Sequence, residues 1–206
     1  MKTSKKLLVI KLIIKDLIYD VYFGIKSSST KKYNQKQFKS INKDNIHYEP
    51  LFYSDLFTVF KKISINSGDT IIDLGCGTGR MALMFAMFYK PNRIIGIDFI
   101  KELIDAANKN RDKVRRKLNC NVDFYVSDVT KFQFDKITMF LMFNPFGTKT
   151  FEEVIDKIKK STIRYPRKIK IIYWNYIHVI DLFKSYDCKK QYPRIKSNRF
   201  TYSRLC

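Results

Sequence analysis

The chain has 206 residues, 45% of them hydrophobic and 15% aromatic, which suffices for one domain with a sizeable core and argues against a disordered protein. It contains 40 Lys and Arg against 19 Asp and Glu, and this formal charge of +21 favours anionic partners such as nucleic acid or an acidic membrane surface. Lys, Ile, Asn, Phe and Tyr have AT-rich codons, so the base composition of the genome is the alternative explanation of the charge.

The N-terminal stretch MKTSKKLLVIKLIIKDLIYDVYFGI begins with basic and apolar residues, as a signal peptide does. Lys11, Lys15 and Asp16 interrupt its apolar run, however, and no small-residue cleavage site follows. Its apolar residues recur at helical spacing, which predicts an amphipathic helix with a stripe of Leu7, Ile10, Ile14, Leu17, Ile18 and Val21. We expect this helix to pack on the main domain or on a partner chain, and an anionic membrane surface is the alternative.

Beyond this helix the chain divides into a linker and a domain of alternating strands and helices. Residues 26–40 are polar, lysine-rich and without apolar periodicity, so we expect an N-terminal helix and basic linker over 1–40 and a main domain over 41–206. Short apolar runs predict strands at 70–74, 93–98, 122–128, 136–143 and 168–174. Helical periodicity predicts helices at 50–63, 80–89, 101–118, 149–162 and 177–186.

This alternation predicts an α/β fold, in which right-handed βαβ units form a mostly parallel sheet with helices on both faces. The C-terminal tail CKKQYPRIKSNRFTYSRL contains two weaker strand candidates around a turn and no helix between them. We therefore expect an antiparallel hairpin at one edge of the sheet, which would bring the number of strands to seven.

The segment IIDLGCGTGRM (71–81) places three glycines where a strand ends and a helix begins. In an open α/β sheet, ligands bind at the carboxyl ends of the strands, and glycine there allows unusual dihedrals and leaves room for a ligand. The spacing is GxGxG, with Arg80 where the dinucleotide fingerprint GxGxxG has its last glycine. The expected ligand is therefore one with an adenosine but no pyrophosphate.

Three aspartates end the strands around this turn. Asp98 follows Gly79 by 19 residues, where a carboxylate can accept hydrogen bonds from both ribose hydroxyls. Asp128 ends the third strand and could accept from an adenine amino group, and Asp73 ends the first strand, close enough to attract an ammonium or a sulfonium. An acidic pocket in a protein of charge +21 favours a cationic ligand. As alternatives, Asp98 could cap the next helix and Asp128 could simply end a strand.

The chain contains the segments DLGCGTGR, IIGID, SDVT and FNPFG. With these four segments the chain, over roughly residues 48–206, resembles the class I S-adenosylmethionine-dependent methyltransferases. The closest resemblance is to a group of small bacterial enzymes with GCGxGR and FNPF motifs. The resemblance implies a Rossmann-like fold and S-adenosylmethionine as cofactor. The methionine part of the cofactor would then lie along the three glycines, its ribose at Asp98 and its adenine at Asp128. The cofactor-binding residues that it implies are Asp73, Gly75, Cys76, Gly77, Gly79, Asp98, Phe99, Asp128, Val129 and, in HYEPLFY, Tyr48.

The segment MFNPFG (142–147) follows the fourth strand, where the resemblance places the methyl acceptor. It matches in part the [N/D]-P-P-[Y/F] motif of amino-directed methyltransferases, in which carbonyl oxygens accept from the substrate NH₂ and an aromatic ring stacks on it. Asn144, Pro145 and Phe146 are thus the catalytic candidates, and a rigid turn is the alternative interpretation. Methyl transfer needs mainly in-line positioning, so no general base is mandatory; only an oxygen acceptor would require one, and His178 is the loosely placed candidate.

Partners and location follow less directly from the sequence. The four cysteines form no CxxC pair or Cys/His cluster, so we expect no metal and, with no secretion signal, a cytoplasmic protein, peripheral to a membrane if the N-terminal helix binds one. The acceptor is left open between a protein amine, nucleic acid, and a glycan or small molecule. The alternative function is a non-catalytic cofactor-binding module that acts as a partner subunit or on a polyanion or membrane surface.

Overall fold

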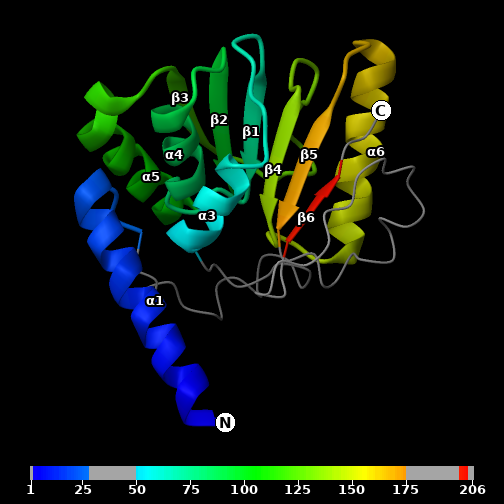
Figure 1. Cartoon of the computed structure of the whole chain (residues 1–206). Helices are drawn as coiled ribbons and strands as arrows, with labels where there is room; N and C mark the ends of the chain where they lie inside the picture. Colours follow the sequence, from blue (N-terminus) through cyan, green and yellow to red (C-terminus); the bar gives the residue numbers. More distant parts are fainter. Residues whose placement is uncertain (1, 28–49, 175–199, 204–206) are drawn as a thin grey trace.

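The structure, a computed structural model, describes residues 2–27, 50–174 and 200–203 (Figure 1). The predicted helix at 177–186, the linker over 28–40 and the first strand candidate of the tail lie outside these residues. The helices are α1 (Lys2–Phe23), α3 (Tyr53–Phe60), α4 (Arg80–Phe88), α5 (Lys101–Val114), the 3₁₀ turn η2 (Arg115–Lys117) and α6 (Thr148–Arg164). The strands are β1 (Thr70–Leu74), β2 (Arg93–Asp98), β3 (Asn121–Val126), β4 (Met139–Phe143), β5 (Lys170–Trp174) and β6 (Phe200–Ser203).

The strands form one sheet in the order β3-β2-β1-β4-β5-β6. The first five strands are parallel, and β6 runs antiparallel to β5. The order reverses direction at β1, between β2 and β4, which is the point where open α/β sheets bind their ligands. The predicted α/β fold with a parallel sheet is confirmed. In the described part of the chain the sheet has six strands, so the seventh strand and the closing hairpin stay predictions.

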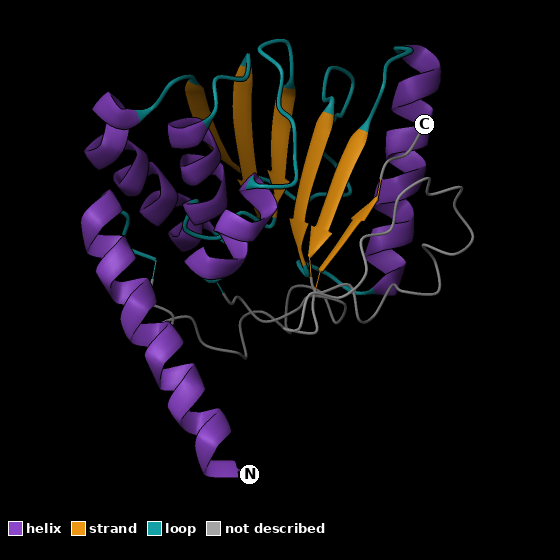
Figure 2. Cartoon of the chain, in the orientation of Figure 1, coloured by secondary structure: helices purple, strands orange, loops and turns teal. Residues whose placement is uncertain are grey.

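Helices cover both faces of the sheet (Figure 2). On one face, α3, α4 and α5 pack on β1 to β4 through a core that includes Leu83, Phe85 and Ile104. On the other face α6 packs through Phe151 and Val154. The strands of the sheet centre are apolar on both sides because both sides are buried, as the run TIIDL with four consecutive buried residues shows.

Several elements are shorter than predicted. β5 begins at Lys170 and not at residue 168, and β3 ends at Val126, so Asp128 lies two residues beyond the strand that it was expected to end. The helix expected at 50–63 spans only Tyr53–Phe60, and the strand expected from residue 136 begins at Met139, because Ile137 donates its amide to the Phe134 carbonyl in a turn. The helix expected to reach residue 118 ends at Val114 and continues as the 3₁₀ turn η2. Element boundaries depend on such local turns, which apolar periodicity does not encode.

Helix α1 is present, but it faces the domain with the opposite side from the expected one. Its C-terminal half packs on α3 and α4 through Tyr19, Phe23 and two buried acids, Asp16 and Asp20. The members of the predicted apolar stripe whose side chains the structure describes are exposed instead: Ile10, Ile14, Leu17, Ile18 and Val21. Its N-terminal half extends away from the domain (Figure 1). Among the residues described, no helix is both long enough and apolar enough to cross a membrane.

Candidate functional site

The three glycines form a tight turn at the carboxyl ends of β1 and β2. Gly75, Gly77 and Gly79 have φ values of 73°, 55° and 80°, in the left-handed region that glycine adopts without strain. The amides of Gly75 and Cys76 both donate to the Ile97 carbonyl, at 2.9 and 3.0 Å, which holds the turn over the end of β2. Cys76 itself is buried, and burial raises the pKa of its thiol, so it is not a reactive cysteine.

The glycine turn touches the Asn-Pro-Phe segment that follows β4. A Cβ on Gly75 would lie 2.5 Å from the Pro145 Cβ, closer than side-chain carbons approach one another. The contact arises because β1 and β4 are paired, with Leu74 opposite Met142, so the residues after both strands meet at the sheet edge. The structure thus brings together two of the motifs that the sequence analysis singled out.

Gly75→Ala is expected to lower the free energy of unfolding by about 1–3 kcal/mol, because the new methyl group meets Pro145 and alanine is strained at this positive φ. Chemical denaturation measures the loss. Gly68→Ala is the matched control, since a Cβ there meets nothing within 4 Å. Equal stability of the two variants would contradict the packing described for Gly75.

Asp98 points toward the glycine turn. Its carboxylate accepts from the amides of Gly77 and Ile100, each at 3.0 Å, so it ties the turn to β2 and closes a short turn ahead of α5. The N-cap residue of α5 itself is Ile100, which has no side-chain cap, so Asp98 does not cap this helix directly. Burial raises the pKa of Asp98 to about 6, against the lowering effect of these amides. Near neutral pH the carboxylate is therefore mostly ionised and can still accept from further donors, because a carboxylate has about four acceptor positions.

Asp98→Asn is expected to weaken binding of an adenosine-containing ligand about tenfold, because the amide keeps one acceptor oxygen but loses the charge. Calorimetric titration with S-adenosylhomocysteine measures the change. Affinity of the unchanged protein should also fall as the pH drops below about 6, where Asp98 takes up a proton. Asp123→Asn, at a half-exposed acid of β3, serves as control. Unchanged affinity in Asp98→Asn would remove Asp98 from the binding site.

Asp73 is the most deeply buried acid at the turn. Burial, together with the neighbouring Asp98, raises the pKa of Asp73 to about 8, against a lowering effect of the Ala82 amide. Its Oδ2 has no hydrogen-bond partner among the described residues. A small cavity reaches Asp73 between Gly75, Arg80 and Phe143. Its volume of about 30 Å³ accepts one small group, so a nucleoside ligand would extend from it along the exposed Gly75.

Asn144 has a strained backbone and a buried side-chain oxygen. Its φ of 43° is the one positive value at a non-glycine residue in the described chain, and its Oδ1 has no hydrogen-bond partner there. Strained, unsatisfied polar residues concentrate at functional sites. Phe146 is instead buried in the core on the α6 face, and Phe143, which the sequence analysis did not single out, is the aromatic residue that lines the cavity.

The segment after β3 lies beside Asp98, since Ser127 donates its amide to the Asp98 carbonyl at 2.9 Å. Asp128 is exposed, and its Oδ1 accepts from the amide and hydroxyl of Thr130, as in a self-stabilised turn. Val129 packs on the α6-face core, and Phe99 packs next to Asp98 on the small cluster that begins α5. Tyr48 and His178 lie outside the described residues.

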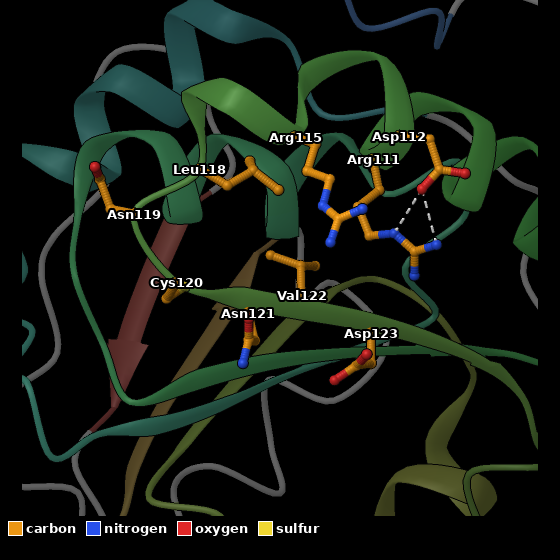
Figure 3. A pocket seen from close by; sticks show the side chains of 9 residues that line it. All are labelled: Arg111, Asp112, Arg115, Leu118, Asn119, Cys120, Asn121, Val122 and Asp123. Atoms are coloured by element: carbon orange, nitrogen blue, oxygen red, sulfur yellow. Dashed lines mark hydrogen bonds and ion pairs between the residues drawn. The ribbon is translucent and has the colours of Figure 1, made fainter.

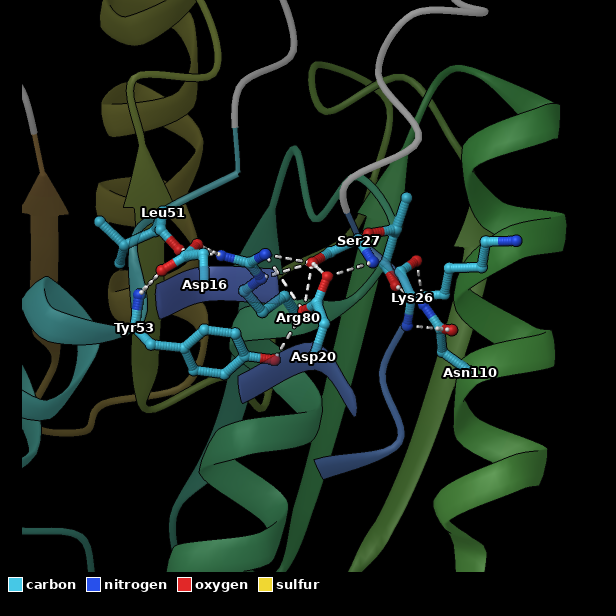
Figure 4. A network of polar contacts seen from close by, with 9 residues as sticks. Asp16, Asp20, Lys26, Ser27, Leu51, Tyr53, Arg80 and Asn110 are labelled. Carbon is cyan, nitrogen blue, oxygen red and sulfur yellow. Dashed lines mark hydrogen bonds and ion pairs between the residues drawn. The ribbon is translucent and has the colours of Figure 1, made fainter. Parts of the chain in front are cut away.

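Arg80, which the sequence analysis noted only as a replaced glycine, lies at the centre of a buried polar network (Figure 4). Its guanidinium forms ion pairs with Asp16 and Asp20 of α1, donates to the Leu51 carbonyl and the Ser27 hydroxyl, and lies 4.4 Å from the ring of Tyr53. Burial raises the pKa of Asp16, a cost that the Arg80 charge offsets in part. Because Arg80 directly follows Gly79, this network connects α1 to the glycine turn.

A larger hollow lies at the other end of the strands from the glycine turn, where β3 begins (Figure 3). It is polar, and its charged residues include the ion pair of Arg111 with Asp112, beside Arg115 and Asp123. It shares no lining residue with the cavity at Asp73. In the described ranges, no group of three or more His, Cys, Asp or Glu side chains could hold a metal ion.

Comparison with known proteins places the chain in a family. A family model described as "Methyltransferase domain" matches residues 65–181, more than half of the chain. A probable cobalt-precorrin-6B C(15)-methyltransferase (decarboxylating) from Methanococcus vannielii is 32% identical over 126 residues, which cover 60% of this chain and 65% of that protein. The chain thus spans less than two thirds of the length of this curated relative.

Solved structures show the same fold at low sequence identity. An RNA methyltransferase from Salinibacter ruber in complex with S-adenosyl-L-homocysteine superposes with a TM-score of 0.58 at 14% identity, covering 76% of this chain and 94% of that one. The precorrin 8W decarboxylase of Methanobacterium thermoautotrophicum gives 0.51 at 22% identity, covering 67% and 70%. The sheet order, the glycine turn with its two buried acids and the match over residues 65–181 agree: the chain belongs to the methyltransferase domain family.

Proposed function

We propose that the protein transfers a methyl group from S-adenosylmethionine, the cofactor that membership of this family implies, to an acceptor held at the Asn144 turn. The observation that carries the proposal is the meeting of the glycine turn, two buried acids and the Asn-Pro-Phe segment at one sheet edge. S-adenosylmethionine supplies an electrophilic methyl group on a sulfonium. A cationic group of the cofactor suits the buried, unpartnered oxygen of Asp73, so the residues present fit it.

We assign the binding roles by position around the turn. Gly75, Gly77 and Gly79 would line the methionine part, and Asp98 would hold the ribose. The adenine would lie beside the segment that follows β3, and the residues around the adenine would be Phe99, Asp128 and Val129. Tyr48 stays a prediction, as does membership of the small bacterial group with GCGxGR and FNPF motifs. The catalytic domain would be 41–206, with 1–40 an appendage whose helix Arg80 fastens to the glycine turn.

We further propose that Asn144 positions an amine acceptor. Its buried Oδ1 can accept a hydrogen bond from an N–H, which would orient the nitrogen lone pair toward the methyl group. Such positioning can contribute about 7–11 kcal/mol in favourable cases. Pro145 would fix the turn against Gly75. Nucleic acid, a protein amine and a small molecule or glycan all stay open as sources of the acceptor.

The direct test is transfer of label from S-adenosyl-[methyl-³H]methionine to a cell extract separated into protein, RNA, lipid and small-molecule fractions. Label in one fraction, absent with heat-inactivated enzyme, would support the proposal and identify the acceptor class. Cofactor binding by calorimetry without label in any fraction would favour the alternative, a non-catalytic cofactor-binding module. Absence of both binding and transfer would overturn the proposed function altogether.

Asn144→Ala is expected to lower kcat at least tenfold and to leave cofactor affinity within about twofold, because the amide would contact the acceptor and not the cofactor. Kinetics with the labelled acceptor and calorimetry with S-adenosylhomocysteine separate the two effects. Asn108→Ala, on the half-exposed side of α5, is the control. Normal transfer by the Asn144 variant would show that this residue has no part in the reaction.

A further inference from the structure

Helix α1 leaves an apolar stripe uncovered, which we define as Ile10, Ile14, Leu17, Ile18 and Val21. Their side chains are 44–83% exposed, although the residues are three or four positions apart and so share one helix face. The opposite face of α1 is the one that packs on the domain, through Tyr19 and Phe23. Single exposed apolar residues are ordinary, but five on one face of one helix indicate a surface that something covers.

Among the described side chains of α1, the charges beside the stripe are basic only. Both acids among the described side chains of α1, Asp16 and Asp20, are buried in the Arg80 network on the other face. The lysines Lys11 and Lys15 are exposed, and at about 100° per residue both lie along the same edge of the stripe. The outward side of α1 thus combines apolar and cationic groups with no exposed acid among its described side chains.

Further basic residues lie at the C-terminal end of the helix. The Lys117 ammonium donates to the carbonyls of Tyr22 and Phe23, at 3.3 and 3.2 Å, so the turn η2 lies against the end of α1. Arg115 and Arg116 of that turn are exposed. The cationic border of the stripe therefore continues from α1 onto η2.

We propose that this surface docks on an anionic lipid bilayer. An amphipathic helix with lysines at the border of its apolar face lies in the membrane interface, with the apolar residues at the acyl boundary and the lysines among the phosphates. Each basic residue near an anionic surface adds to the electrostatic attraction. An uncharged apolar partner would gain no such attraction from the lysines. A second copy of the chain is less suited to the stripe, because pairing two α1 helices would also bring their Lys11 and Lys15 edges together.

The N-terminal half of α1 extends past the carboxyl edge of the sheet, the edge that carries the glycine turn (Figure 1). The inference does not depend on the proposed methyl transfer, because the stripe and the lysines lie outside the site.

The test is co-sedimentation of the full chain with vesicles of phosphatidylcholine alone and vesicles that also contain phosphatidylglycerol. We expect binding to the anionic vesicles to be at least about tenfold tighter and to weaken as salt is raised. Ile14→Ser with Ile18→Ser should reduce that binding at least about tenfold. Lys11→Ala with Lys15→Ala should reduce it by up to about 30-fold and remove much of the preference for anionic lipid.

Matched controls distinguish this surface from the general charge of the protein. Ile163→Ser, at an 80% exposed residue of α6, and Lys136→Ala with Lys160→Ala, at exposed positions elsewhere, should bind vesicles like the unchanged chain. The proposal would be overturned if the chain bound neutral and anionic vesicles equally well. It would also be overturned if the control variants lost as much vesicle binding as the variants of the stripe and its lysines. A dimer in sedimentation velocity that Ile14→Ser with Ile18→Ser dissociates would overturn it as well, since a second copy would then cover the stripe. Calorimetry with S-adenosylhomocysteine, expected to be unchanged in all variants, keeps this outcome separate from the proposed function.

Discussion

Replacement of Arg80 by Met is expected to lower the free energy of unfolding by about 3–5 kcal/mol, because it leaves the carboxylates of Asp16 and Asp20 buried without their counter-charge. The variant should also loosen α1, since Arg80 of α4 forms ion pairs with Asp16 and Asp20 of this helix. Denaturation in urea measures the loss of stability, and amide exchange of residues 10–23 measures the loosening. Cofactor affinity should fall together with stability, because Arg80 directly follows Gly79 of the glycine turn.

Two comparisons isolate the cause of this loss. Arg93→Met removes an ion pair of similar length, 2.8 Å to Asp123, whose partners are 42% and 37% exposed, and should cost less than about 1 kcal/mol. Adding Asp16→Asn and Asp20→Asn to Arg80→Met should restore part of the lost stability, since no buried charge then lacks a partner. A loss for Arg80→Met no larger than that for Arg93→Met would show that the network adds little to stability.

The strands and the glycine turn could be predicted from the sequence because each has a strong local signal. Runs such as TIIDL and RIIGID are uninterrupted and apolar, and the central strands that they form are buried on both faces. The glycines at 75, 77 and 79 are needed where the chain takes positive φ, so their spacing fixes the turn. Asp98 could be placed for the same reason, since a residue that ends a strand next to such a turn faces it.

The orientation of α1 could not be predicted, because hydrophobic periodicity assigns the apolar side of a helix to the core. Here buried ion pairs decide the orientation: Asp16 and Asp20 are four residues apart, on one face, and the buried Arg80 pairs with both. The signal was present as an arginine in the otherwise apolar helix RMALMFAMF, which needs acids to bury it. Only the tertiary contact shows which acids these are.

The aromatic residue at the acceptor end was equally hard to assign. Phe143 and Phe146 flank the Asn-Pro pair on either side, and the motif alone favours Phe146. The turn after β4, with its positive φ at Asn144, directs Phe146 into the α6-face core and leaves Phe143 at the cavity. A local backbone irregularity of this kind reverses which side a side chain takes, and sequence spacing does not report it.

Asp73→Asn is expected to make the free protein more stable and its cofactor binding weaker. The pKa of Asp73 is raised to about 8, so between about pH 4 and pH 8 the folded state holds a proton that the unfolded state has released. Stability of the unchanged protein therefore falls as pH rises through this window, by at most about 1.4 kcal/mol per pH unit from this group, and levels off above about pH 8. Asparagine does not titrate, so the variant lacks this pH-dependent loss of stability. The variant should therefore be more stable than the unchanged protein, by a margin that grows with pH.

Binding should change in the other direction. A cationic group of the cofactor would favour the ionised form of Asp73 and lower its pKa, so its loss should weaken binding about 100-fold near pH 7.5, as expected for a buried charge-assisted hydrogen bond. Thermal unfolding over pH 5–8 and calorimetry with S-adenosylmethionine measure the two effects, and Asp105→Asn, at an exposed acid of α5, should change neither appreciably. A variant that gains stability but keeps full affinity would mean that Asp73 is a structural acid and that the cation lies elsewhere. Opposite signs in stability and binding would instead indicate that the fold gives up stability at Asp73 in order to hold the cation.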